Sequence, residues 1–337
     1  MGNSVPGPTR RGRSPVLAGI QLAVAVGLTC VLLLRIDIRR SLELMRSANV
    51  PFLVLAVLLL VVQFAVCNLR WQILLRARNR HYPWPFLFRV YLASTALNSV
   101  LPSSLGGDFL RVAWTAEPGN TAEAVSVVLV DRALGMLGLL VLSLAASFVL
   151  IAGKASGGLL LVNLLVLGAV MFAAMALFIE PAYRLVRAVL IRIRPFGIGV
   201  KVLAVLDGIR AFRRPARPIA LASGLSIASL VMYSFVWYVL GLAIGCTTPP
   251  IFYLVYVPVV ALAAMIPVSI GGVGIRENGF VILMTRQGMS QPQAAAVALL
   301  FLLLTYLFAL AGVIILIGLK RRAAEPPAVS QPGGVEG

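Results

Sequence analysis

Long apolar runs separated by short polar segments dominate this chain. Six of them approach or exceed the roughly 20 residues that a helix needs to cross about 30 Å of hydrocarbon. These runs are residues 16–34, 51–67, 125–152, 158–179, 219–242 and 294–318. Hydrophobic residues make up 60% of the 337 and charged residues only 12%, a balance that leaves a soluble protein without enough polar surface. The sequence therefore predicts an all-α integral membrane protein with about six full spans.

The basic residues gather at the ends of these runs. The net charge is +18, but the sequence has no nucleic-acid motif, so we assign the basic residues to topology and lipid headgroups and expect no nucleic-acid partner. Positive residues prefer the cytoplasmic side, which predicts a multi-pass protein of the inner (cytoplasmic) cell membrane with both termini inside. The segments placed inside are 1–15, 68–80, 181–217 and the tail that begins at Lys320. The weakest part of this orientation is the outer loop 35–50, which also carries four arginines.

Two further segments, 86–120 and 251–290, must leave the membrane on the side where they enter it. The predicted orientation requires this. The first segment lies between an inner loop and a span that starts inside, and the second lies between an outer loop and a span that starts outside. We therefore predict two re-entrant helical hairpins, one from each face.

The two hairpins contain the same motif. ALNSVLPSSLGGDFLR at 96–111 and ALAAMIPVSIGGVGIR at 261–276 align without a gap, with seven of sixteen positions identical. Shared membrane composition is the alternative explanation, but Pro, Ser, Gly-Gly and Arg all fall in register. Because three spans separate equivalent points, we predict an inverted internal repeat, as in many transporters. The predicted divisions are a basic N-terminus (1–15), a first half (16–152), the first span of the second half (153–180), a basic amphipathic linker (181–217), the rest of that half (218–319) and a disordered cytoplasmic tail (320–337).

Each motif combines a helix break with an arginine. Pro102 removes a backbone donor and Gly106-Gly107 permits unusual backbone, so freed amides at the next helix start can bind phosphate or carboxylate. Arg111 follows on the same face. Charged residues inside a span are functional by default, which adds Asp131 and Arg132. The candidate substrate-binding residues are Asn98, Pro102, Ser103, Ser104, Gly106, Gly107, Asp108, Arg111, Asp131, Arg132, Pro267, Ser269, Gly271, Gly272, Gly274, Arg276 and Glu277.

Purely structural roles remain open for several of these residues. Asp108 can cap a helix and pair with Arg111, and Asp131 can pair with Arg132 or with Arg111. Asn98 can hydrogen-bond across helices or line a cavity.

Enzymatic chemistry finds little support in the sequence. The single histidine, His81, is interfacial, and the three cysteines are far apart, so we expect no metal, cofactor or disulfide. The intramembrane carboxylates sit beside arginines that keep them ionised, and no nucleotide motif is present. We expect that the chain is not an enzyme.

The motif set NxxLPSxxGGDxxR, a following Asp-Arg and IPxSIGGxGxRE resembles the flippase-like membrane domain of bacterial lysylphosphatidylglycerol synthase/flippase proteins, over residues 16–319. The resemblance implies movement of a lipid headgroup between leaflets, the lipid being an anionic phospholipid or a polyprenyl-phosphate-linked lipid. In the bifunctional relatives a cytosolic aminoacyltransferase domain follows, and here only a short tail does, so we expect no synthase activity in this chain. Two rival functions are a non-transporting scaffold that docks a separate transferase on 181–217, and a membrane-embedded lipid transferase.

Overall fold

The computed structural model of the chain is helical throughout the part that it describes. That part comprises residues 37–100, 106–152, 179–192, 198–214, 216–265 and 269–322, with isolated positions within 23–27 and 164–168. Within these ranges no strand occurs, which confirms the all-α prediction. Apart from these isolated positions and residue 179, the predicted spans 16–34 and 158–179, the N-terminal segment 1–15 and nearly all of the tail lie outside the described residues.

Four helices are long and apolar enough to cross a bilayer, and they match four of the predicted spans. They are α3 (Val50–Arg76), α6 (Thr121–Ala152), α10 (Ala216–Ala243) and α13 (Gln291–Arg322). The prediction was wrong about the end of α3, because the helix continues through most of the segment assigned to the loop 68–80. It continues because its polar residues, Arg70 among them, face inward and find buried partners.

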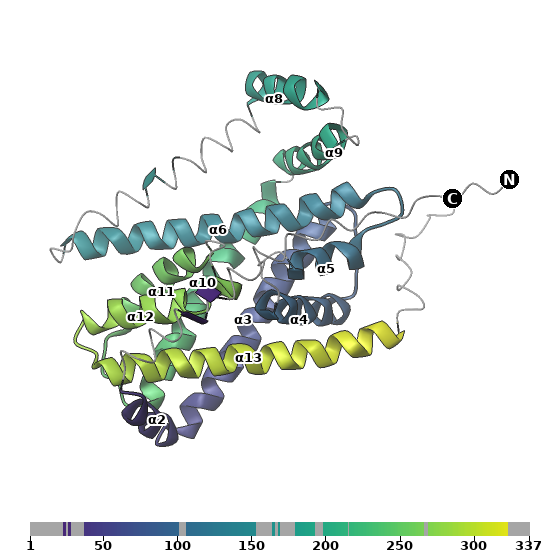
Figure 1. Cartoon of the computed structure of the whole chain (residues 1–337). Helices are drawn as coiled ribbons and strands as arrows, with labels where there is room; N and C mark the ends of the chain where they lie inside the picture. The colour runs from purple at the N-terminus through teal and green to yellow at the C-terminus, as the bar shows by residue number, and fades with distance from the viewer. Residues whose placement is uncertain are drawn as a thin grey trace.

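Shorter helices form two pairs, one around each repeated motif. The first pair is α4 (Trp84–Val100) and α5 (Gly106–Thr115), and the second is α11 (Pro250–Ala264) and α12 (Ile275–Thr285), joined through the 3-10 turn η3 (Ile270–Gly272). The two helices of each pair pack against each other. In Figure 1 the α4–α5 pair lies toward one end of the space between α6 and α13, and the α11–α12 pair toward the other end.

The two halves pack reciprocally. α4 of the first half packs along α13 of the second, α11 of the second half packs along α6 of the first, and α3 packs along α10. Because the sequence repeat matches α3, α4–α5 and α6 with α10, α11–α12 and α13, the main contacts between halves occur as counterparts. Reciprocal contacts of this kind are expected when two related halves face each other across a pseudo-twofold axis.

Close backbone approach holds these helices together. A Cβ at Gly312 of α13 would lie 2.4 Å from the carbonyl oxygen of Leu92 on α4, so only glycine fits at this crossing. In the second half, Trp237 of α10 packs between Phe280 and Phe301, with ring centroids 4.4 and 4.3 Å away. These contacts fix α4 and α12, the helices that carry the motifs, against the long spans.

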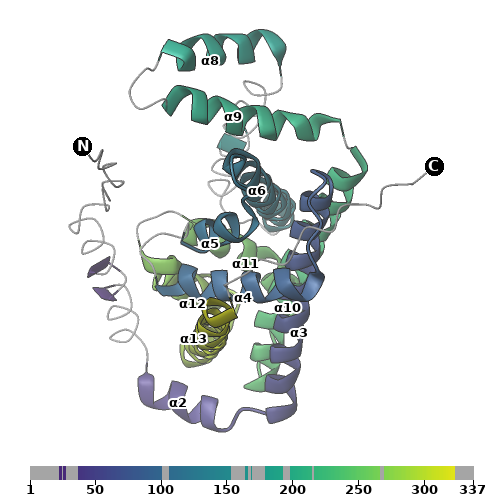
Figure 2. The same ribbon diagram turned by 90° about the vertical axis from the view of Figure 1, so that its right-hand side faces the viewer.

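Three helices lie at the periphery. α2 (Ile38–Arg46) falls in the predicted outer loop 35–50 and is capped by Asp37, which accepts a hydrogen bond from the backbone of Arg40. α8 (Glu180–Arg192) and α9 (Ile198–Arg210), followed by η2 (Ala211–Arg213), form a layer over α6 (Figure 2). Arg210 donates a hydrogen bond to Glu180, which lowers the pKa of that carboxyl below its usual value.

Candidate functional site

A buried ion network lies between the first motif and the spans around it, centred on Asp131 of α6. Asp131 is 1% exposed; its Oδ1 accepts a hydrogen bond from Nε of Arg70 at 2.6 Å and its Oδ2 accepts one from Nη2 of Arg111 at 2.7 Å. Arg70 also donates from Nη1 to Oγ of Ser226 on α10 at 3.0 Å. One carboxylate therefore connects α3, α5, α6 and α10.

Aromatic rings contact the guanidinium of Arg111, in addition to its hydrogen bond with Asp131. Its guanidinium carbon lies 4.3 Å from the ring centroid of Trp71 and 5.3 Å from that of Tyr91, a cation–π arrangement on two sides. The residue is 5% exposed. The sequence left Arg132 and Arg111 open as partners of Asp131. In the structure Asp131 pairs with Arg111, and also with Arg70, which the sequence did not indicate.

The neighbouring Arg132 turns to a different partner. Its Nη1 donates to Oδ2 of Asp108, at the start of α5, and Oδ1 of the same carboxylate lies 3.7 Å from Nη1 of Arg111. The side chains of Asp108 and Arg132 are 17% and 22% exposed, so this pair is more open than the Asp131 network behind it.

The first glycine motif brings α5 into backbone contact with α4. A Cβ at Gly107 would lie 2.2 Å from the carbonyl oxygen of Ser94. The N–H of Gly107 donates to Oδ1 of Asn98 at 2.8 Å, so a side chain of α4 satisfies an amide that the helix start leaves free. Gly106 is buried beside it at the first position of α5. The predicted residues Pro102, Ser103 and Ser104 lie outside the described residues.

The second glycine motif uses left-handed backbone. Gly271, Gly272 and Gly274 have φ of 59°, 74° and 84°, a region that strains any other residue. The N–H of Gly274 donates to Oε2 of Glu277 at 2.6 Å, which caps α12. A Cβ at Gly271 would lie 3.3 Å from the carbonyl oxygen of Asn98, so the two motifs meet directly. Pro267 lies outside the described residues.

Glu277 and Arg276 form the charged pair of the second motif. Glu277 is 1% exposed, and its Oε1 accepts from both Nε and Nη2 of Arg276, at 3.0 and 2.8 Å. Ser269 is buried nearby, and its hydroxyl has no hydrogen-bond partner in the described part of the chain. Arg276 also has a side-chain hydrogen bond with Tyr233, and Glu277 has both oxygens occupied.

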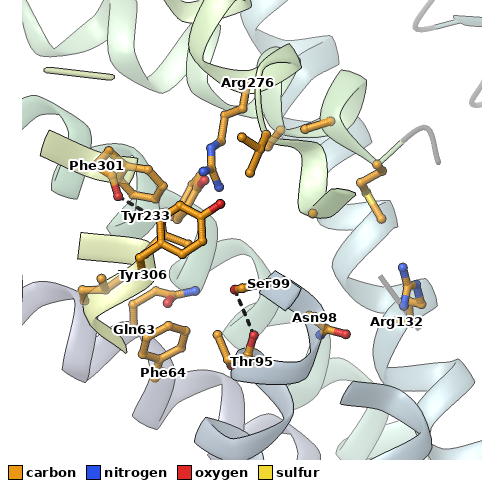
Figure 3. Close-up of a pocket in the computed structure, with 17 residues that line it drawn as sticks. Gln63, Phe64, Thr95, Asn98, Ser99, Arg132, Tyr233, Arg276, Phe301 and Tyr306 are labelled. Carbon is orange, nitrogen blue, oxygen red and sulfur yellow. Dashed lines mark hydrogen bonds between the residues drawn. The ribbon is translucent and has the colours of Figure 1, made fainter. Parts of the chain in front are cut away.

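Two adjoining cavities of about 310 Å³ each lie between the motifs. The Arg276 cavity, shown in Figure 3, has Arg276 on one side and Arg132 on the other. The Asp131 cavity lies toward α5 and includes the Asp131 network. Both cavities share the side chains of Gln63, Thr95, Asn98, Arg132 and Met265. Asn98 thus has both of the roles that the sequence left open, a hydrogen bond across helices and a place in a cavity wall.

Several cavity residues were not predicted from the sequence. Arg70 was placed in the inner segment 68–80, Gln63, Tyr233 and Tyr306 fell within predicted spans, and Thr95 fell within the first predicted re-entrant hairpin. A polar or aromatic side chain in a span faces lipid, protein or cavity depending on packing, and the sequence pattern alone does not distinguish these cases. Within the described ranges no group of three His, Cys, Asp or Glu side chains is arranged to hold a metal ion, and Cys67 and Cys246 are buried free thiols.

The comparisons with known proteins identify a family of membrane proteins. Residues 20–312 match the family described as the lysylphosphatidylglycerol synthase TM region. A UPF0104 membrane protein of Pyrococcus horikoshii is 24% identical over 131 residues, which cover 37% of this chain and 39% of that protein. The family match includes both glycine motifs and all four arginines of the cavities, and with the four apolar helices it shows a multi-pass membrane protein. The chain belongs to the family of the lysylphosphatidylglycerol synthase transmembrane region, as the motifs predicted.

Proposed function

We propose that this protein is a flippase-like lipid transporter that moves a phosphate-bearing headgroup between the membrane leaflets. The observation that carries the proposal is the pair of adjoining polar cavities between the two glycine motifs, with Arg132 and Arg276 in their walls. Irregular backbone at membrane depth is tolerated where it lines a cavity, and a cavity with cationic walls lowers the cost of carrying phosphate through hydrocarbon. Membership of a lipid-related membrane family supports the same function.

In this proposal the two helix pairs are re-entrant hairpins that enter from opposite faces, and the two halves are inverted relative to each other. The reciprocal packing of α4 on α13 and α11 on α6 supports this arrangement. So does the position of the two pairs toward opposite ends of the long helices (Figure 1). Broken helices from both halves would then meet around one central substrate site.

The arginines divide into two roles. Arg276 and Arg132 face cavity space and contact the phosphate, whereas Arg70 and Arg111 hold Asp131 and shape the wall. Because the buried carboxylates of Asp131 and Glu277 accept hydrogen bonds from arginines, they are poor general bases, which supports the expectation that the chain is not an enzyme.

Transport is testable in vesicles. We expect purified protein in liposomes to move fluorescent phosphatidylglycerol across the bilayer, measured by dithionite bleaching of the outer leaflet. Arg276→Gln should slow this movement by roughly tenfold or more, because a charged hydrogen bond to phosphate is lost. Arg276→Lys, which keeps the charge but not the forked donor, should fall between Gln and wild type.

The matched control for this experiment is Arg39→Gln on α2, whose side chain is 92% exposed, and it should transport like wild type. Wild-type vesicles that bleach no faster than protein-free vesicles would contradict the proposed function. Transport that persists unchanged in a stably folded Arg276→Gln variant would contradict the assigned site alone.

A second candidate function is a scaffold for a separate transferase. It is favoured by a cavity of about 720 Å³ beside α9 and η2 that is lined by Arg78, Arg210, Arg213 and Arg214. This basic surface suits an acidic partner. Arg213→Glu with Arg214→Glu should abolish co-purification of such a transferase from native membranes while leaving vesicle transport intact. Loss of transport alone, with the partner retained, would count against the scaffold.

A further inference from the structure

The largest basic cavity of the described chain lies away from the glycine motifs. It has a volume of about 720 Å³, and we call it the basic cavity after the four arginines in its wall, Arg78, Arg210, Arg213 and Arg214. None of these residues lines the Arg276 cavity or the Asp131 cavity. The transport proposal therefore does not account for the basic cavity.

The basic cavity lies where two apolar spans meet the polar part of the chain. Ala77 and Arg78 directly follow α3, and Arg213 and Arg214 lie just before α10. Both helices are long and apolar enough to cross a bilayer, and they pack along each other. Their adjoining ends therefore lie at the boundary between hydrocarbon and water, which is the depth of the phosphates of one leaflet.

Two carboxylates accompany these arginines, and each of them is shared. Glu123 lies 2.9 Å from Nε of Arg78 and 3.4 Å from Nη2 of Arg80. Glu180 accepts a hydrogen bond from Arg210, and that bond, with the charges of neighbouring arginines, lowers the pKa of its carboxyl below the usual value. Positive charge around the cavity thus exceeds the negative charge that is paired with it.

Arg213 and Arg214 carry the excess. Both are exposed, and neither forms an ion pair within the part of the chain that the structure describes, although the charge of Arg213 is felt at Glu180. The turn that carries them is anchored, because Phe212 is 4% exposed and belongs to the same hydrophobic cluster as Leu75 of α3. Two arginines are therefore held at the end of a span with charge to offer a ligand.

An apolar face of α8 adjoins this charge. The bond between Glu180 and Arg210 ties α8 to the basic cavity. Leu185 and Val189, one helical turn apart on α8, are 68% and 53% exposed. A lipid leaflet offers phosphate and hydrocarbon side by side, so it suits exposed aliphatic side chains beside arginines better than an acidic protein segment does.

From these observations we infer that the basic cavity is a second lipid site, which binds an anionic phospholipid of the leaflet that contains the end of α3. Arg213 and Arg214 donate charge-assisted hydrogen bonds to its phosphate, and Leu185 and Val189 contact its acyl chains. This lipid stays in its leaflet and steadies the layer of α8 and α9 on α6. The inference does not depend on the proposed transport function.

The test measures lipid retention by native mass spectrometry of the full chain in detergent. An Arg276→Gln background weakens binding in the Arg276 cavity, and in this background the protein should retain phosphatidylglycerol in preference to phosphatidylcholine with identical acyl chains. Adding Arg213→Gln with Arg214→Gln should raise the apparent dissociation constant for phosphatidylglycerol by roughly tenfold or more. The matched control is Arg39→Gln with Arg40→Gln, an exposed adjacent pair on α2, and it should change nothing.

Two outcomes would overturn this inference. Unchanged retention in Arg213→Gln with Arg214→Gln, at a wild-type melting temperature, would exclude a lipid and leave this surface to the acidic partner of the scaffold function. Displacement of phosphatidylglycerol by millimolar glycerol 1-phosphate would assign the cavity to a soluble phosphate ester, because that competitor has no acyl chains for α8. Arginine-dependent retention without any transport in liposomes would sink the transport function and support this second site.

The aliphatic side chains have a test of their own. Leu185→Asn with Val189→Asn keeps every arginine and should still weaken retention of phosphatidylglycerol, because contact with the acyl chains is lost. Binding of glycerol 1-phosphate should be the same with and without this change. Undiminished lipid retention in this variant would contradict the role assigned to α8.

Discussion

Replacing Asp131 by Asn is expected to lower the free energy of unfolding by about 3–5 kcal/mol, because it removes the charge of the carboxylate that pairs with two buried arginines and leaves Arg111 only Asp108, at 3.7 Å. Arg70 and Arg111 both bond to this one carboxylate, and both are less than a tenth exposed. An Asn side chain has a single acceptor oxygen and no charge, so only one of the two arginines keeps a well-aligned hydrogen bond to residue 131. Thermal unfolding in detergent, followed by size-exclusion of the heated protein, measures the effect.

The control is Glu43→Gln at the surface of α2. Glu43 pairs with Arg39, but its side chain is 62% exposed, so the change should cost only about 0–1 kcal/mol. The double variant Asp131→Asn with Arg70→Gln should recover part of the loss, because one of the uncompensated charges is removed with the carboxylate. Equal melting of Asp131→Asn and wild type would show that the ion network does not hold α3, α5 and α6 together.

The sequence predicted the long helices well where length and apolar composition decide the outcome. α3, α6, α10 and α13 are such helices, and each begins close to its predicted start. The end of α3 was predicted wrongly, because an arginine at position 70 is typical of a loop. Its buried partner, Asp131, lies 61 residues away in the sequence. Tertiary partners determine whether a polar residue ends a span or continues it.

The candidate site shows the same limit at smaller scale. The repeat placed Gly106 and Gly271 in equivalent positions, and the structure brings Gly271 against Asn98, so the two motifs meet as that repeat implied. The choice of partners was not predictable, since the adjacent residues Asp131 and Arg132 both bond to α5 but to different side chains, Arg111 and Asp108. Nor were Tyr233 and Tyr306, because an aromatic residue at a cavity wall has the same sequence signal as one facing lipid.

Gly107→Ala is expected to separate α5 from α4 and to abolish most transport. The added Cβ would lie 2.2 Å from the carbonyl oxygen of Ser94 and 2.8 Å from Nδ2 of Asn98, and the nearer contact is with backbone, which has no rotamer to change. Overpacking of this kind costs about 1–3 kcal/mol, and loss of the Asn98 hydrogen bond to the Gly107 amide adds about 1 kcal/mol. Faster hydrogen exchange of the α5 amides, residues 106–115, would report the separation.

The matched substitution is Gly224→Ala in the exposed middle of α10, where nothing lies within 4 Å of the added Cβ. Alanine is the better helix former by about 1 kcal/mol, so this variant should be as stable as wild type or more so and should transport normally. If both alanine variants behave alike, the close contact between α4 and α5 is not what positions Asp108 and Arg111. If only Gly107→Ala loosens α5, the charged groups of the site depend on one backbone contact that no side chain can replace.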